Sequence, residues 1–462
     1  MQKTTFSTPL LDQLISYCER PMTPFHMPGH AGGNNIHPKI KAFLGDNVFK
    51  ADLTELDFLD NLSNPTGVIK ETQDKIAKIF NAKASFILVN GSTCGLMALI
   101  LSIVSNGEQI LVPRNCHRSI INALILSDAK PVWYLPEWIK EKELFGYISP
   151  EKFDRLLEEN SNVKAVLIVN PTYEGISSNT GALVSISKKY DIPVIVDEAH
   201  GGHWQFNSNF PESALEAGAD AVVQSFHKSC GSLSQSSLLH ISHKSSISPH
   251  VVEENLKLLQ STSPSYILMA SLDAATSYIA SEEGMEDLNR TYTLSVELRN
   301  KLKSIKSISL LESSKNFSID PTRIFASIKG LSGEAMANII ENQYNIAIES
   351  LNNTGNLFFI NMGNRQEHID LLYKTFCEIT THSYNQIIPV LPEPRLPDLK
   401  MSLRKAYFSE SEKIKIKNAS GRICRFPQVK CPPGICMLLP GEEISDYHLN
   451  FFNADDEIDV IK

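Results

Sequence analysis

Short apolar runs that alternate with helical patterns occupy residues 65–245, and they constrain the fold more than any other feature. Helical patterns such as residues 94–104 and 183–190 lie between several of these runs. Apolar strands that are joined by helices form a parallel sheet that is buried on both faces. We therefore predict an α/β fold with a mainly parallel sheet. The predicted strands are residues 85–89, 109–113, 131–134, 165–169, 193–197, 221–226 and 237–241.

The sequence changes character on both sides of this block. The first fifty residues read as irregular, and Pro28 and Gly29 exclude a helix interior from the loop at residues 25–30. Residues 282–305 have the pattern of one long helix, and prolines recur between Pro389 and Pro397 as in a linker. We predict four parts: an N-terminal arm (1–64), a large domain (65–285), a small α/β domain (286–385) and a C-terminal domain (386–462).

Composition excludes several classes of protein. The net charge of -9 over 462 residues argues against a nucleic-acid or anionic-membrane partner. There is no long apolar run and the N-terminus lacks the pattern of a signal peptide, so we expect no membrane span and a cytoplasmic location. Eight scattered cysteines also fit a reducing compartment. Cys431 and Cys436 lack a second pair or a nearby His, so no metal site is expected.

Five turns that follow predicted strands carry reactive or anion-binding residues. In an open parallel sheet, ligands bind at the carboxyl ends of the strands. Ser92 and Thr93 lie beside glycines at a predicted helix start, where hydroxyls, backbone N–H groups and the helix dipole favour a phosphate. Helix N-capping is the alternative explanation for both residues. The other four turns are residues 113–119, 170–175, 196–201 and 225–232.

Three residues in these turns have the chemistry of a cofactor site. His117 is a flat aromatic group suited to stacking on a planar ring, or else a surface His. Asp197 ends an apolar strand, where a carboxylate is costly unless a cation such as a protonated pyridine nitrogen meets it. Lys228 follows another apolar strand, where shielding from water lowers the pKa of an amine and makes it a nucleophile. Capping by Asp197 and a solvated loop position for Lys228 are the structural alternatives, and Thr172 and Tyr173 in a further turn are weak evidence.

Together, a phosphate turn, a stacking His, a carboxylate for a ring nitrogen and a lysine for an aldehyde are the parts of a pyridoxal-phosphate (PLP) site. At these residues the chain resembles the bacterial-type ornithine/lysine/arginine decarboxylases, which have PLP fold type I (aspartate-aminotransferase-like). The resemblance covers nearly the whole chain and is strongest to the short members without an N-terminal wing domain, which include arginine decarboxylases. The segments that carry it are residues 25–30, 52–67, 113–119, 170–175, 196–201, 225–237, 421–423, 432–435 and 440–442.

The resemblance implies a role for each matching residue. Lys228 matches the Schiff-base lysine, Asp197 the partner of the pyridine nitrogen, and His117 the histidine that stacks on the ring. His200 matches a residue beside the cofactor ring, and Lys228 or His227 would return a proton to the α-carbon. The matching phosphate contacts are Ser92, Thr93, Ser225 and His227. The chain departs from the family at Ala31, at Ser63 and at Ser402-Leu403-Arg404, and the first two departures fall in segments that shape the substrate pocket.

The implied reaction is PLP-dependent decarboxylation of a basic amino acid. Arginine would give agmatine, lysine cadaverine or ornithine putrescine, as in polyamine biosynthesis; the short architecture favours arginine. Acidic residues in the segment 52–60 are candidates for the distal cation of the substrate. The resemblance also implies a homodimer or a larger homo-oligomer.

Three other functions compete with this one. A PLP aminotransferase often carries an arginine soon after the lysine, but residues 229–237 contain none, and a decarboxylase gains nothing from clamping the departing carboxylate. A protein that binds PLP without catalysis would not need Lys228, Asp197 and His117 together. Residues 197–200 spell Asp-Glu-Ala-His, as in helicases, but no Gly-x-x-x-x-Gly-Lys-Ser/Thr motif precedes them.

Overall fold

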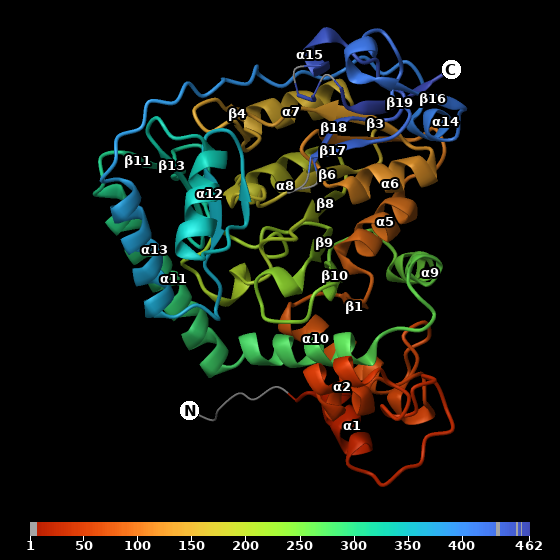
Figure 1. Cartoon of the computed structure of the whole chain (residues 1–462). Coiled ribbons are helices and arrows are strands. Elements are labelled where there is room, and N and C mark those ends of the chain that lie inside the picture. The colour runs from red at the N-terminus through yellow and green to blue at the C-terminus, as the bar shows by residue number, and fades with distance from the viewer. Residues whose placement is uncertain (1–6, 431–434, 450, 454) are drawn as a thin grey trace. The chain divides into compact units, whose positions relative to one another are not determined.

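The computed structural model describes residues 7–430, 435–449, 451–453 and 455–462 (Figure 1). The Pro432-Pro433-Gly434 part of the C-terminal motif, and Cys431, lie outside these residues. The chain divides into two compact units, and each is built from two separate stretches of sequence. The first unit comprises Met1–Leu99 and Asp197–Thr291, and the second comprises Ile100–Val196 and Tyr292–Lys462.

The first unit contains three neighbouring strands in the order β1 (Ala84–Leu88), β10 (Ser237–Ile241) and β9 (Ala221–Gln224). Both pairs are antiparallel, with Leu88 opposite Ser237 in the first pair. All five residues of β10 and all four of β9 are buried. The helices and 3-10 turns of this unit are α1 (Pro9–Cys18), α2 (Pro38–Leu44), α3 (Asp46–Ala51), η1 (Asp57–Leu59), α4 (Val68–Ile79), η2 (Trp204–Phe206), η3 (Phe226–Lys228), α9 (Pro249–Leu259) and α10 (Tyr266–Ile279).

A glycine allows helix α5 (Gly91–Ile103) to lie close to these strands. A Cβ atom on Gly95 would stand 2.5 Å from Cδ1 of Leu88 and 3.2 Å from Cγ1 of Val223. Ordinary van der Waals contacts between carbons are longer than either distance. The absence of a side chain at Gly95 therefore brings the first turn of α5 to the end of β1.

The N-terminal region holds more helix than the sequence indicated. We predicted an irregular first fifty residues, but α1 begins with a proline in its first turn and buries Leu10, Leu14 and Tyr17 along one face. A proline at this position loses no helix hydrogen bond, and the spacing of the buried residues is helical. The loop predicted at residues 25–30 does contain no helix or strand.

The second unit contains neighbouring strands in the order β8 (Val194–Asp197), β6 (Val166–Val169), β2 (Gln109–Pro113) and β3 (Lys130–Tyr134). Strand β2 runs parallel to both β3 and β6. Asp197, the last residue of β8, already belongs to the first unit. The helices between these strands are α6 (Arg118–Ser127), α7 (Pro150–Glu159) and α8 (Thr180–Lys189), and the short strands are β4 (Trp138–Ile139), β5 (Leu144–Phe145) and β7 (Ile176–Ser177).

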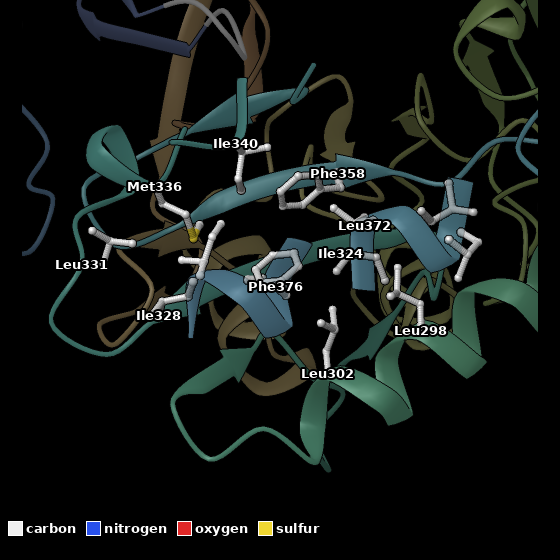
Figure 2. Close-up of a cluster of buried hydrophobic side chains, with 14 of the residues drawn as sticks. Leu298, Leu302, Ile324, Ile328, Leu331, Met336, Ile340, Phe358, Leu372 and Phe376 are labelled. Carbon is white, nitrogen blue, oxygen red and sulfur yellow. The ribbon is translucent and has the colours of Figure 1, made fainter. Parts of the chain in front are cut away.

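A separate four-stranded sheet follows the long helix α11 (Glu282–Lys303), in the order β11-β13-β15-β14. Leu298 and Leu302 of α11 and Leu372 and Phe376 of α13 pack together with Ile324 of β13 in one hydrophobic cluster, which Figure 2 shows. This cluster is the core of the predicted small domain. The elements are β11 (Ile308–Leu310), β12 (Ser318–Ile319), β13 (Arg323–Ile328), α12 (Gly333–Tyr344), β14 (Ser350–Leu351), β15 (Asn356–Phe359) and α13 (Gln366–Ile379).

The C-terminal region is joined to the end of β2 by a buried ion pair. Arg114 Nη2 donates to Glu442 Oε2 at 2.8 Å and to the Met437 carbonyl at 3.2 Å. Burial raises the pKa of Glu442, and the Arg114 charge opposes that rise. The elements of this region are α14 (Leu403–Tyr407), β16 (Ser411–Lys415), η4 (Ile416–Asn418), β17 (Gln428–Lys430), β18 (Ile435–Leu438), α15 (Asp446–Leu449) and β19 (Glu457–Ile461).

All seven predicted strands are present, and their ends differ from the predicted ones by at most two residues. The direction of β10 was not predicted: it runs antiparallel to β9, because their connection holds only the 3-10 turn η3. A parallel return needs a longer crossover, usually through a helix. Among the described residues, no helix combines the length and apolar character that crossing a membrane requires.

Candidate active site

Two predicted phosphate contacts meet in the first unit at the start of α5. Ser92 Oγ and Ser225 Oγ lie 2.7 Å apart, and both residues are buried. Thr93, also in the first turn of α5, is half-buried. Gln235 holds this turn in place, because its carbonyl accepts from the Gly91 N–H at 2.9 Å and its Nε2 donates to the Val89 carbonyl at 2.7 Å.

This corner has the chemistry of a phosphate site. The hydroxyls of Ser92 and Ser225 meet at the N-terminus of α5, a helix of 13 residues. The N–H groups of its first turn and the positive end of its dipole attract a phosphate to the same place. Gly91 has a φ of 73°, a conformation that glycine adopts without strain. N-capping alone would need one hydroxyl, whereas here two hydroxyls from separate elements converge.

Asp197 lies at the carboxyl end of β8 with 5% of its surface exposed. Its Oδ1 accepts from the Ala199 N–H at 3.2 Å, so Asp197 also caps the turn that follows β8. The strand that precedes it is buried at every position. A carboxylate in such a place is costly without strong donors or a cation, so it is suited to a protonated ring nitrogen.

The predicted nucleophile lies beside a histidine. Lys228 Nζ and His200 Nε2 are 3.0 Å apart, and His200 is 6% exposed. The neighbouring His227 donates from Nδ1 to the Ser236 carbonyl at 2.8 Å. Burial is the main cause that lowers the pKa of His227, and the charge of Lys228 lowers it further, against the Ser236 carbonyl. His227 therefore favours the neutral form, with the proton on Nδ1 fixed by the backbone.

His117 belongs to the second unit, where it precedes α6 as its N-cap. Its Nδ1 accepts from the Ser119 N–H at 3.2 Å and lies 2.9 Å from Ser119 Oγ. The side chain is exposed. These contacts orient the imidazole ring.

The groups of the first unit fit PLP by their chemistry. Paired serine hydroxyls at a helix N-terminus suit its phosphate, a buried carboxylate suits its pyridine nitrogen, and an amine that is partly shielded suits its aldehyde. Among the eight predicted cofactor residues, Ser92 contacts Ser225, and Lys228 contacts His200.

A second buried acid, for which no role was predicted, stands next to Asp197. Glu198 is fully buried, and its two carboxylate oxygens accept from the Ala214 N–H and from Gln224 Nε2, each at 2.7 Å. Burial raises the pKa of Glu198 to about 8, although the bonds from Gln224 and Ala214 lower it. Glu198 is thus mostly uncharged at pH 7. Its only signal in the sequence was its place next to Asp197, directly after an apolar strand.

Comparisons with known proteins identify the family of this chain. Residues 8–367 match the family described as "Orn/Lys/Arg decarboxylase, major domain", and residues 380–460 match its C-terminal domain. The "Arginine decarboxylase" of Bacillus anthracis is 35% identical over 461 residues, which are 97% of this chain and 93% of that protein. The "Constitutive lysine decarboxylase" of Escherichia coli (strain K12) is 28% identical over 64% of this chain and 44% of that protein.

The fold agrees as well. The solved structure of the lysine decarboxylase LdcF of Francisella novicida superposes with a TM-score of 0.85 at 21% identity, and the match covers 98% of this chain and 81% of that one. The predicted PLP fold type I is therefore confirmed.

Proposed function

The chain belongs to the Orn/Lys/Arg decarboxylase family, and we propose that within it the substrate is L-arginine and the products are agmatine and CO2. Family membership makes the protein a PLP-dependent decarboxylase of a basic amino acid. The observation that supports arginine is the match with an arginine decarboxylase over almost the full length of both chains. The lysine decarboxylase of Escherichia coli aligns over less than half of its own length.

We propose that the residues of the first unit hold the cofactor at three points. Ser92 and Ser225 bind the phosphate together with the first turn of α5, where Thr93 adds a further donor. Asp197 keeps a proton on the ring nitrogen, because its carboxylate is buried and favours a cation. Lys228 forms the covalent bond to the cofactor aldehyde. Bound PLP supplies an electron sink for the pair that the departing carboxylate leaves behind.

His200 sets the protonation of Lys228 in this proposal. His200 Nε2 stands 3.0 Å from the amine and accepts its proton when the amine must be a nucleophile. His227 keeps its Nδ1 proton on the Ser236 carbonyl, so its Nε2 is an acceptor in the neutral ring and donates to the phosphate only when the ring gains a second proton. Lys228, once the substrate amine has replaced it, carries the proton that the α-carbon receives.

The family resemblance also supports an oligomer. We propose that the protein works as a homodimer or a larger homo-oligomer in the cytoplasm. Size-exclusion chromatography with light scattering tests this proposal, and a single mass near 51.4 kDa would contradict it.

Product analysis of the purified holoenzyme tests the substrate. Arginine, lysine and ornithine are each supplied with and without 2-oxoglutarate, and CO2 and amines are measured. We expect CO2 and agmatine without any keto acid, with kcat/KM for arginine at least about tenfold above the other two, a difference of about 1.4 kcal/mol. Faster release of CO2 from lysine or ornithine would overturn arginine as the substrate. Glutamate formation without CO2 would mean that the enzyme is an aminotransferase.

A further inference from the structure

A cavity of about 350 Å³ lies in the second unit, and no residue that lines it belongs to the predicted cofactor set. Small-molecule sites commonly have volumes of about 300–1,000 Å³. The hairpin β4–β5, strands β13 and β14, the proline-rich segment near Leu391 and the C-terminal region supply the walls. Large apolar or aromatic side chains that line it include Trp138, Phe145, Phe325, Leu351, Tyr447 and Phe452.

Glu143 lines this cavity with a carboxylate that is only half satisfied. The residue is 7% exposed, and its Oε1 accepts from the Leu391 N–H at 2.7 Å. Its Oε2 is buried, and no donor in the described ranges contacts it. A buried carboxylate oxygen without a donor carries a large desolvation cost. Such an oxygen indicates a partner that the chain itself does not provide.

Glu174 is a second acid in the wall. Its Oε2 accepts from Thr172 Oγ1 at 3.1 Å. Burial raises the pKa of Glu174 to about 7, and the Thr172 hydroxyl opposes the rise. No described Lys, Arg or His side chain lies within ion-pair distance of Glu143 or Glu174. Both acids are therefore available to a cation from outside.

Each described basic side chain that lines the cavity is paired, neutral or exposed to solvent. Arg114 is paired with Glu442, and His448 is neutral at pH 7 because burial lowers its pKa to about 4. Arg395 is exposed to solvent, in the proline-rich segment. Glu143 and Glu174 are therefore acids in the wall without an ion-pair partner among the described basic side chains that line the cavity.

The aromatic side chains select the kind of cation. Trp138 and Phe145 meet edge to face, with ring centroids 5.3 Å apart. Aromatic faces attract organic cations, and the apolar walls favour an alkyl chain. A hydrated metal ion would require several oxygen ligands, and no cluster of three or more candidate ligands occurs in the part of the chain that the structure describes.

We propose that this cavity binds a small alkyl ammonium ion, with Glu143 and Glu174 as its anionic contacts and Trp138 and Phe145 as its aromatic wall. The chemical class is a straight-chain amine or diamine. The proposal does not depend on which basic amino acid the enzyme decarboxylates, because it rests on the second unit alone.

Titration of the holoenzyme with 1,4-diaminobutane tests this proposal. Calorimetry measures binding, and tryptophan fluorescence reports on Trp138. A change in the visible absorbance of the cofactor distinguishes diamine that binds beside Lys228 from diamine that binds in the cavity. We expect saturable binding with a fluorescence change that Trp138→Phe removes. The uncharged 1,4-butanediol should bind at least about tenfold more weakly. Equal binding of the diol would refute an ammonium site.

A matched pair of variants assigns the charge. Glu143→Gln keeps an oxygen that accepts from the Leu391 N–H but loses the charge, so affinity should fall at least about tenfold. Glu141→Gln makes the same change at an exposed neighbour and should alter affinity by less than about twofold. If thermal unfolding shows that Glu143→Gln is not folded, Glu174→Gln carries the same expectation. Absence of binding at about 10 mM diamine, or unchanged affinity in the folded glutamate variant, would overturn the site.

Discussion

Replacing Asp197 with Asn isolates the charge at the end of β8. The Asn side chain keeps an oxygen that accepts from the Ala199 N–H, so the 3.2 Å capping contact and the fold should survive. What disappears is a negative charge on a residue that is 5% exposed. If that charge holds a proton on the cofactor ring, the variant should bind PLP and fail in catalysis.

The size of the effect follows from electrostatics. Two unit charges about 4 Å apart interact by about 4 kcal/mol at an effective dielectric constant of about 20. Each 1.4 kcal/mol corresponds to about tenfold in rate, so kcat should fall by about 100-fold to 1,000-fold. The assay is CO2 release from arginine at saturating PLP, with cofactor content checked by absorbance.

Glu198→Gln is the matched control, because it changes the adjacent acid in the same way. Glu198 is mostly uncharged at pH 7, so this variant should stay within about threefold of the parent kcat. A kcat within about tenfold of the parent in Asp197→Asn would refute the charge argument and favour a capping role. An equal loss in both variants would also refute it.

Three further predictions concern cofactor affinity, stability and pH. Ser225→Ala removes one of two hydroxyls that lie 2.7 Å apart. The affinity for PLP should fall at least about tenfold in an absorbance titration, since a hydrogen bond to a charged group contributes about 1.5–3 kcal/mol. Unchanged affinity would remove Ser225 from the phosphate site. Arg114→Met leaves Glu442 buried and unpaired and should lower the free energy of unfolding by about 3–5 kcal/mol. Adding Glu442→Leu to this variant should restore most of the lost stability. If Arg114→Met alone is as stable as the parent in a urea titration, the ion pair does not stabilise the fold. Burial raises the pKa of Glu198 from 4.5 to about 8, so its contribution to stability is fully present below pH 4.5 and is lost as the pH rises through about 8. The melting temperature of the parent should therefore fall more between pH 5 and pH 9 than that of Glu198→Gln, and equal slopes would be evidence against a neutral Glu198.

The positions of the strands could be predicted because each is a short apolar run that ends in a polar turn. β2 and β8 are examples, and the reactive residues at their ends follow from the rule for open sheets. The direction of β10 was missed, although the connection from β9 is too short for the helical crossover that a parallel strand needs. The N-terminal helices were missed because the His, Gly and Pro of residues 25–30 led us to predict irregular structure for the whole segment.

The pairing of site residues needed three-dimensional contacts. Ser92 and Ser225 are 133 positions apart in the sequence, and nothing local indicates that their hydroxyls meet. Lys228 and His200 could each be proposed singly, but not their 3.0 Å contact. Glu143 carried no signal at all, because its burial depends on the distant Leu391. The division into four domains stays a prediction.

Identifying the lysine that carries PLP tests directly whether Lys228 binds the cofactor. Borohydride reduction of the purified holoenzyme fixes the cofactor to its lysine, and mass spectrometry of the digested protein identifies the modified peptide. We expect the modification on Lys228 alone, and loss of both the modification and the visible cofactor absorbance in Lys228→Ala. Modification of any other lysine in the parent, or an unchanged cofactor spectrum in Lys228→Ala, would show that Lys228 is not the residue that binds PLP.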